Sequence, residues 1–187
     1  MPPRRGETGM ELTEKKVTSE VVFQGQILTV LRDTAELPNG KTAEREVVRH
    51  PGGVAVLPLD EDGNVLLVRQ FRYPFGRVLL EIPAGKLDRG EEPLHAAVRE
   101  LEEETGVEAE ELISLGSIYV SPGFCDEELH LYLAQGLKQG KSHPDEDEFL
   151  APEKVPFEVL TEQIMSGAIH DGKTVAAVLK AKLYLER

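Results

Sequence analysis

Cysteine is scarce in this chain, and long apolar runs are absent. Cys125 is the single cysteine among 187 residues, so no disulfide can form within the chain, which is typical of proteins in a reducing cytoplasm. No apolar run approaches the roughly 20 residues that span a bilayer. Arg4 and Arg5 have no apolar stretch behind them, so neither a secretory nor a twin-arginine signal is predicted. We expect a soluble, cytoplasmic protein that does not enter a membrane.

Basic residues are also few. The chain has 21 Lys and Arg against 34 Asp and Glu, which gives a formal net charge of −13. This balance argues against sequence-independent binding of a nucleic-acid backbone, which depends on an excess of Lys and Arg. An acidic protein with an anionic substrate needs metal ions or locally placed arginines, although an acidic surface also serves solubility alone.

The first part of the chain predicts a small antiparallel sheet. β-like patterns cover three segments, of which the last two are joined by Pro38-Asn39-Gly40, a hairpin signal: 17–23, 27–37 and 41–48. Three short strands bury little by themselves, so this sheet must pack on something else. We therefore expect a tail at 1–11, an N-terminal sheet at 12–50 and a main domain at 51–187.

The main domain alternates apolar strands with helices. Strands are predicted at 54–59, 65–70, 78–82, 113–120 and 129–134, and helices at 92–105, 161–167 and 174–185. A polar loop at 138–148 follows the last strand. This order predicts an α/β fold of the layered α+β kind, with a mixed sheet and interspersed helices.

The helix at 92–105 carries the most informative pattern. At about 100° per residue, four apolar residues share one face and are predicted to enter the core: Leu94, Ala97, Val98 and Leu101. Glu100, Glu103 and Glu104 fall within an arc of about 100°. Because like charges one turn apart destabilise a helix, a compensating charge is expected. A hard divalent cation such as Mg²⁺, which takes oxygen ligands and is shared with phosphates, is one candidate. The alternative is a solvated acidic face.

The segment that contains this helix resembles the Nudix box, G-x5-E-x7-R-E-U-x-E-E-x-G-U, where U is an apolar residue. Every specified position is filled, by Gly85, Glu91, Arg99, Glu100, Leu101, Glu103, Glu104, Gly106 and Val107. The resemblance implies a mixed β-sheet sandwiched between helices, with two to three Mg²⁺ or Mn²⁺ ions bound by Glu100, Glu103 and Glu104. It also implies that Glu91 and Arg99 form a pair that braces the loop before the helix.

Three further features resemble the ADP-ribose pyrophosphatase group of this family. Pro122 lies 16 residues after Gly106, as the marker proline of that group does. Glu81-Ile82-Pro83-Ala84-Gly85 resembles the strand that enters the box, in which the alanine carbonyl reaches a metal, so Ala84 becomes a further metal ligand. The predicted sheet at 12–50 resembles the group's extra sheet domain, which is exchanged across a homodimer.

The same resemblance implies the catalytic roles. A water molecule activated by the metal ions is the expected nucleophile. In the group, its base is a glutamate of an acidic loop after the box, which here is the segment 143–149. Glu148 is the favoured base and Glu146 the reserve, while Glu103 counts both as a metal ligand and as a catalytic residue.

Substrate binding is expected to involve two arginines, because the planar guanidinium matches two phosphate oxygens. Arg72 and Arg45 resemble the substrate arginines of the group, and Arg45 is expected to act on the partner subunit's site. Glu81 either accepts hydrogen bonds from the base or the ribose, or braces the loop. An aromatic platform for adenine stays unassigned among Phe23, Phe71 and Tyr73.

The expected reaction is the Mg-dependent hydrolysis of ADP-ribose to AMP and ribose 5-phosphate. The box holds only metals and phosphates, so another nucleotide sugar or a dinucleotide, such as ADP-glucose or GDP-mannose, is the alternative substrate. A non-catalytic module that senses a nucleotide sugar is a rival of a different class, but the intact box acids favour an enzyme.

Overall fold

The structure is a computed structural model that describes residues 11–140, 143 and 149–187. These residues divide into two units. The first contains the chain up to His50 together with Ser121–Asp126, and the second contains Pro51–Val120 and Glu127–Arg187. Most of the predicted tail, residues 1–10, lies outside the described residues, as do Glu146 and Glu148.

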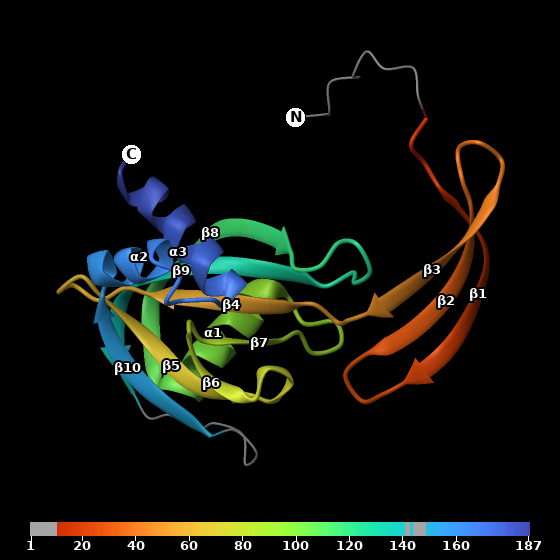
Figure 1. Cartoon of the computed structure of the whole chain (residues 1–187). Coiled ribbons are helices and arrows are strands. Elements are labelled where there is room, and N and C mark those ends of the chain that lie inside the picture. Colours follow the sequence, from red (N-terminus) through yellow and green to blue (C-terminus); the bar gives the residue numbers. More distant parts are fainter. Residues whose placement is uncertain (1–10, 141–142, 144–148) are drawn as a thin grey trace. The chain divides into compact units, whose positions relative to one another are not determined.

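The first unit is built on a three-stranded antiparallel sheet, in which β2 (Thr29–Glu36) lies between β1 (Lys15–Gln24) and β3 (Thr42–Arg49) (Figure 1). The predicted turn at Asn39-Gly40 joins β2 and β3, and Gly40 adopts a φ of +78° that suits glycine. All of β1 is exposed. In the described part of this unit only Asp33 and Ala35 are buried, so the sheet covers little of its own apolar surface.

The segment Ser121–Asp126, which contains Pro122, is attached to the end of β3. The Val48 N–H donates to the Phe124 carbonyl at 2.7 Å, and the Val48 carbonyl accepts from the Asp126 N–H at 3.1 Å. Arg49 forms an ion pair with Asp126 at 2.6 Å. The proline of the sequence pattern therefore belongs to the first unit.

The described part of the second unit contains two sheets. A mixed sheet has the order β7-β4-β9-β8, in which β4 and β9 are parallel and the other pairs are antiparallel. Its strands are β4 (Gly53–Pro58), β7 (Ala84–Lys86), β8 (Val107–Tyr119) and β9 (Glu128–Gln139). An antiparallel sheet has the order β10-β5-β6, formed by β5 (Asn64–Arg72), β6 (Arg77–Glu81) and β10 (Leu150–Pro156). A short 3-10 turn, η1 (Tyr73–Phe75), lies between β5 and β6.

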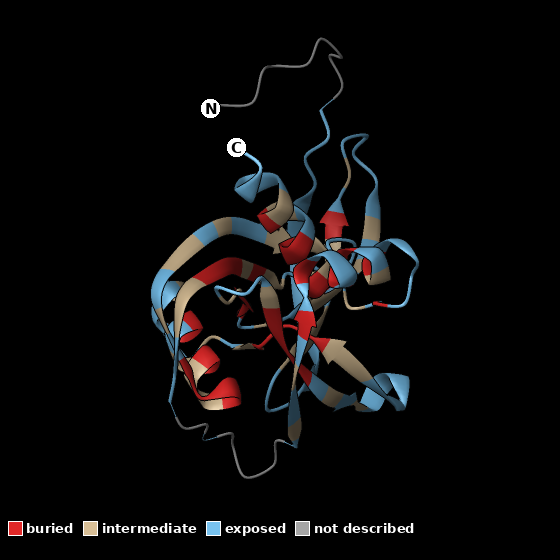
Figure 2. Ribbon diagram, turned by 90° about the vertical axis from the view of Figure 1, so that its left-hand side faces the viewer, coloured by how far each residue is buried: buried red, intermediate tan, exposed pale blue. Residues whose placement is uncertain are grey.

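Helices cover both faces of the mixed sheet. They are α1 (Pro93–Thr105), α2 (Phe157–Met165) and α3 (Gly172–Leu185). Successive side chains of β4 alternate between two core clusters: Val54 and Val56 pack in the cluster of α1, whereas Ala55 and Leu57 pack in that of α2 and α3. Every residue of β4 is buried (Figure 2), as expected for a strand covered on both faces. The predicted fold, a mixed sheet between helices with an N-terminal three-stranded sheet, is confirmed.

The face that α1 turns to the core differs from the prediction. Ala97 and Leu101 are buried as predicted, but Leu94 and Val98 are 47% and 45% exposed, so the prediction for these two is wrong. Glu100 and Glu104 are buried instead. A hydrophobic period does not reveal this burial, because the two carboxylates are held by hydrogen bonds from the Ala84 N–H of β7 and from Arg99.

Two strands have no clear signal in the sequence. β7 has three residues, too few to show alternation, and β10 contains Pro152 and Pro156, which count against a strand. Because β10 is an edge strand paired with β5 alone, a proline without an N–H is tolerated there. The long pairing of β8 with β9 also continues through polar positions such as Glu108 opposite Lys138, into the segment predicted as a polar loop. Similarly, α2 begins at Phe157 and not at residue 161.

Candidate active site

Gly85, in the middle of β7, leaves the space that the Glu100 side chain occupies. A Cβ atom on Gly85 would lie 1.9 Å from both Cδ and Oε1 of Glu100, far inside van der Waals contact. β7 is held in place by β4, where Gly85 pairs with Val54. The first residue of the box is therefore glycine because the carboxylate of a later box residue approaches its backbone closely.

Arg99 joins the loop before α1 to two acids of the helix. Its Nε and Nη2 lie 3.0 and 2.9 Å from the Glu91 carboxylate oxygens, so the predicted brace is confirmed. Its Nη1 donates to Glu100 at 2.7 Å and to Glu103 at 3.0 Å. The hydrogen bonds from Arg99 and from the Asp88 backbone lower the pKa of Glu91 to about 2. The hydrogen bonds from Arg99 to Glu91 and to the helix acids raise the pKa of Arg99 above its ordinary value.

Glu104 lies one turn after Glu100 and is 3% exposed. Its Oε2 accepts a hydrogen bond from the Ala84 N–H at 3.0 Å, so the structure brings two predicted metal ligands together. The contact is made by the Ala84 amide; the role predicted for its carbonyl stays a prediction. Because Glu100 is also only 8% exposed, a solvated acidic face does not describe these two residues.

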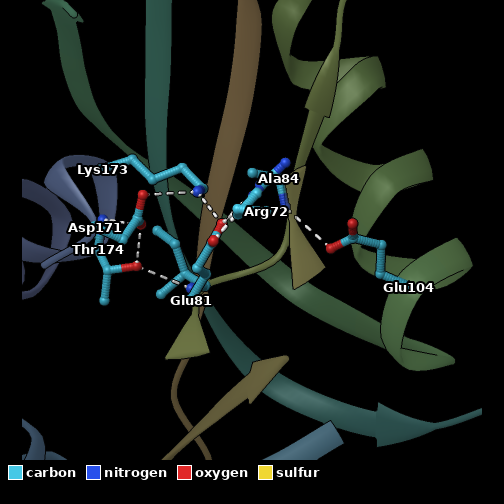
Figure 3. A network of polar contacts seen from close by, with 8 residues as sticks. Arg72, Glu81, Ala84, Glu104, Asp171, Lys173 and Thr174 are labelled. Atoms are coloured by element: carbon cyan, nitrogen blue, oxygen red, sulfur yellow. Dashed lines mark hydrogen bonds and ion pairs between the residues drawn. The ribbon is translucent and has the colours of Figure 1, made fainter. Parts of the chain in front are cut away.

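A second charged network lies at the end of β6 (Figure 3). Glu81 is 1% exposed and accepts from Arg72, whose Nε lies 2.9 Å from Oε1 and whose Nη2 lies 2.6 Å from Oε2. Lys173 also donates to Oε2 of Glu81, and its Nζ lies 2.9 Å from Oδ1 of Asp171. Arg72 and Glu81, both predicted to bind substrate, are therefore paired with each other.

The charges of this network stabilise one another. Burial raises the pKa of Glu81, but the hydrogen bonds and charges of Arg72 and Lys173 outweigh burial, so the pKa is lowered and Glu81 is ionised. Glu81 in turn raises the pKa of Arg72, to which Asp171 and Glu104 contribute electrostatically. Arg72 is thus a permanent cation near the acids of α1, and its side chain is 37% exposed.

A cavity of about 270 Å³ borders the network along the edge of β6. Arg77, Gln163 and Asp171 contribute to its lining. Among the described residues that line it, Asp171 is the only acid, so this cavity does not offer the cluster of oxygen ligands that a divalent cation prefers.

The residues around β7 and α1 fit a hard divalent cation by their chemistry. Glu100, Glu103 and Glu104 supply carboxylate oxygens, and the cradle at Gly85 is one that a Cβ atom would fill. Within the described ranges, no three His, Cys, Asp or Glu side chains are already gathered around one point. Arg99 supplies the positive charge at Glu100 and Glu103 in this arrangement.

The sequence was compared with models of known protein families, and two of them match. Residues 49–178 match the model described as NUDIX domain. The chain belongs to the Nudix hydrolase family. Residues 14–48 match a second model, the nucleoside diphosphate sugar hydrolase N-terminal domain. The helix α1 with its buried glutamates lies inside the matched region, and the nine box residues of the sequence pattern fall within it as well.

Relatives extend the similarity over nearly the whole chain. This Nudix hydrolase is 44% identical to an ADP-ribose pyrophosphatase of Bacillus subtilis (strain 168) over 169 residues, 89% of this chain and 91% of the relative. It is also 44% identical to a methanol dehydrogenase activator of Bacillus methanolicus, over 91% of this chain and 93% of the relative. The crystal structure of an ADP compounds hydrolase has the same fold, with a TM-score of 0.83 at 24% identity, covering 94% of this chain and 96% of that one.

The other predicted site residues lie in several places. Arg45 belongs to the first unit, where it forms an ion pair with Glu14 at 2.7 Å. Glu146 and Glu148 lie outside the described residues, but the ends of their loop are described. The His143 N–H donates to the Glu103 carbonyl at 3.0 Å, and Leu150 pairs with Gln70 of β5. His143, which lies between β9 and β10, is therefore tied to the last turn of α1.

Asp171, Lys173 and Thr174 belong to the network around Glu81, and the sequence analysis did not predict them there. Asp171 is the N-cap of α3 and accepts from the Thr174 N–H at 3.0 Å. An Asp before Gly-Lys-Thr is a recognisable helix start, and this signal could have located the element. The contact between Lys173 and Glu81 spans 92 positions of sequence, and no local pattern predicts it.

Proposed function

We propose that this Nudix hydrolase cleaves the diphosphate of ADP-ribose to give AMP and ribose 5-phosphate. The observation that carries the proposal is the burial of Glu100 and Glu104 against β7, with Arg99 bridging Glu100 and Glu103. The choice of substrate is supported by the Bacillus subtilis relative, an ADP-ribose pyrophosphatase that is 44% identical over most of both chains.

Glu100, Glu103, Glu104 and the Ala84 carbonyl would hold two to three divalent cations, Mg²⁺ or Mn²⁺. When bound, such ions neutralise phosphate charge and lower the pKa of a water molecule. Arg99 donates hydrogen bonds to the Glu100 and Glu103 carboxylates and so orients them.

The chain's remaining residues handle the substrate and the proton. Arg72, already a cation beside Glu81, donates to a phosphate oxygen. Glu148, or Glu146 in its place, accepts a proton from the attacking water. The water oxygen bonds to one phosphorus, and the bridging oxygen leaves with the other phosphate, which gives two monophosphates.

A homodimer that exchanges its N-terminal sheets is part of the proposal. It is supported by the exposed apolar residues of β1, where Val17, Val21 and Phe23 are each more than half exposed. In such a dimer Arg45 acts on the partner subunit's site.

A cytoplasmic location also belongs to the proposal and rests on the single cysteine. In the part of the chain that the structure describes, no helix is both long and apolar enough to cross a bilayer.

A substrate panel tests the reaction. ADP-ribose, ADP-glucose, GDP-mannose and a dinucleotide are compared at one Mg²⁺ concentration, with the products identified. We expect kcat/KM for ADP-ribose to exceed the others by at least about tenfold, or about 1.4 kcal/mol of transition-state preference. The variant Glu104→Gln, assayed alongside, controls for contaminating hydrolases. A tenfold preference for another member would refute the substrate and leave the hydrolase assignment standing.

Regulation of another enzyme is the second candidate function. It is favoured by the relative named methanol dehydrogenase activator, which has the same 44% identity. The same panel distinguishes the two functions, because a purely regulatory protein binds a nucleotide sugar in calorimetry without releasing products. Turnover that depends on Glu104 would instead establish catalysis at the proposed site.

A further inference from the structure

Two cations share one buried carboxylate at the end of β6 (Figure 3). Arg72 approaches Glu81 side-on, through Nε and Nη2, and Lys173 approaches the same Oε2 atom. The Lys173 side chain is 11% exposed and that of Arg72 is 37% exposed. Lys173 is therefore the inner partner, and Arg72 is the cation that a ligand can reach.

Hydrogen bonds of the neighbouring Thr174 side chain hold Lys173 in this position. The Thr174 hydroxyl donates to Asp171 at 2.5 Å and accepts from the Ile82 N–H at 3.0 Å, and Thr174 is completely buried. Ile82 follows Glu81 directly, and Lys173 precedes Thr174 directly. The hydrogen bond between Thr174 and Ile82 thus places Glu81 and Lys173 beside each other.

The charges in this network balance: Arg72 and Lys173 are opposed by Glu81 and Asp171. Without Lys173, one cation would face two carboxylates, with Glu104 also acting on Arg72. An anionic diphosphate would then meet a site with net negative charge, and Glu81 would hold Arg72 more tightly. Electrostatic complementarity of this kind changes affinity when a buried partner is lost.

We propose that Lys173 is a positioning residue for the diphosphate: it shares the charge of Glu81 and so leaves the Arg72 guanidinium able to bind a phosphate oxygen. This inference rests on the proposed function, because it assumes that Arg72 meets a phosphate. It assigns to the N-terminus of α3 a role in substrate affinity. Asp171 weakens this effect, because it also forms an ion pair with Lys173 and so competes with Glu81 for the ammonium group.

Binding of ADP with Mg²⁺, measured by calorimetry, tests the proposal without requiring turnover. Lys173→Met is expected to weaken binding about tenfold, which corresponds to about 1.4 kcal/mol. Lys173→Arg keeps the charge and should stay within about threefold of the wild type. Lys182→Met is the matched control, since it removes one positive charge from the same helix, where Lys182 pairs with Glu158 at 3.0 Å.

Asp171→Asn gives a prediction of opposite sign. Asparagine is also a good N-cap, so α3 should still begin at the same place. Without the Asp171 carboxylate, Lys173 interacts with Glu81 alone of these two acids, and its charge offsets that of Glu81 more fully. ADP should then bind more tightly, by about two- to threefold, as expected when a like charge is removed from an anion site. If Lys173→Met fails to fold, the sign of this change decides the proposal, because weaker or unchanged binding contradicts it.

A double-mutant cycle with Arg72→Met separates positioning from direct contact. If Lys173 acts through Arg72, adding Lys173→Met to Arg72→Met should change ADP affinity by less than about twofold. In turnover of ADP-ribose, Lys173→Met should raise KM with kcat altered less than about threefold. The inference would be overturned if the losses of ADP affinity in the two single variants multiplied in the double variant. It would also be overturned if Lys173→Met bound ADP as tightly as the wild type, or if the wild type did not bind ADP. Failure of turnover together with intact ADP effects would overturn only the proposed reaction.

Discussion

Glu104 combines a buried carboxylate with a hydrogen bond to the backbone of β7. Glu104→Gln keeps an oxygen that can accept from Ala84 but removes the negative charge that a metal ligand needs. We expect kcat/KM to fall at least about a hundredfold, because metal ions supply several kcal/mol of transition-state stabilisation. Glu102→Gln, a neighbouring change on α1, is the control. A loss below about tenfold, with the same thermal unfolding, would remove Glu104 from the ligand set.

Glu91 contributes to the stability of the protein against acid through its ion pair with Arg99. Its folded pKa of about 2 lies below the ordinary value of 4.5 because Arg99 and the Asp88 N–H bind the ionised form. Protonation therefore favours the unfolded chain, and the stability due to this pair is present above about pH 4.5 and is lost as the pH falls toward 2. In urea unfolding at pH 6 and pH 3, Glu91→Gln should lose less stability on acidification than the wild type or Glu61→Gln. An equal loss in all three proteins would contradict this role.

The sequence predicts residues of the box better than residues outside it. Glu91 and Arg99 form the pair that the resemblance implies, since both lie within one short segment of chain. Lys173 could not be found in this way, because its partner Glu81 is brought to it only by the contact between the N-terminus of α3 and the end of β6. The burial of Glu100 was also hidden, because its room depends on the missing side chain of Gly85.

The geometry of the site depends on the close contact between two elements, β7 and α1, at Gly85 and Glu100. Gly85→Ala would place a methyl group at 1.9 Å from Glu100 atoms, so the Glu100 side chain must move. We expect activity to fall by more than about tenfold, because displaced catalytic groups lose rate steeply. Gly123→Ala, where nothing lies within 4 Å of the added Cβ, should leave activity unchanged. Equal activities of the two variants would show that Glu100 need not occupy this cradle.

The loop between β9 and β10 carries the predicted base. Glu148→Gln is expected to lower kcat by a factor of about 10²–10⁴, the usual contribution of a positioned base, with KM little changed. Glu146→Gln, two positions earlier, serves as the matched comparison. If the drop in kcat appears in Glu146→Gln and not in Glu148→Gln, the reserve residue is the base.

Elements with a clear period are predicted well, and elements defined by partners are not. The strand β4 and the helix α1 have strong patterns and lie within a residue or two of their predicted positions. β10 forms despite two prolines because it needs hydrogen bonds to β5 on only one side. The outward position of Leu94 and Val98 follows from the acids that α1 must turn inward, which a hydrophobic period cannot reveal.

At the scale of the whole molecule, the charge of −13 constrains how two copies can meet. Two such chains repel each other, so a stable dimer must bury enough apolar surface to outweigh that repulsion. The exposed Val17 and Val21 of β1 offer such a surface. Because salt screens like charges, raising the ionic strength should favour the dimer.

Light scattering tests the homodimer. The wild type is expected at twice the chain mass of 20.7 kDa at micromolar concentration, and the double variant Val17→Asp/Val21→Asp should shift toward the monomer, because it places charge in an apolar contact. Thr18→Asp adds charge to the same exposed strand and should stay dimeric if the two valines form the contact. Activity should fall with the dimer, since Arg45 is proposed to act in the partner's site. A monomeric wild type, or full activity after deletion of residues 1–48, would refute the exchanged sheet.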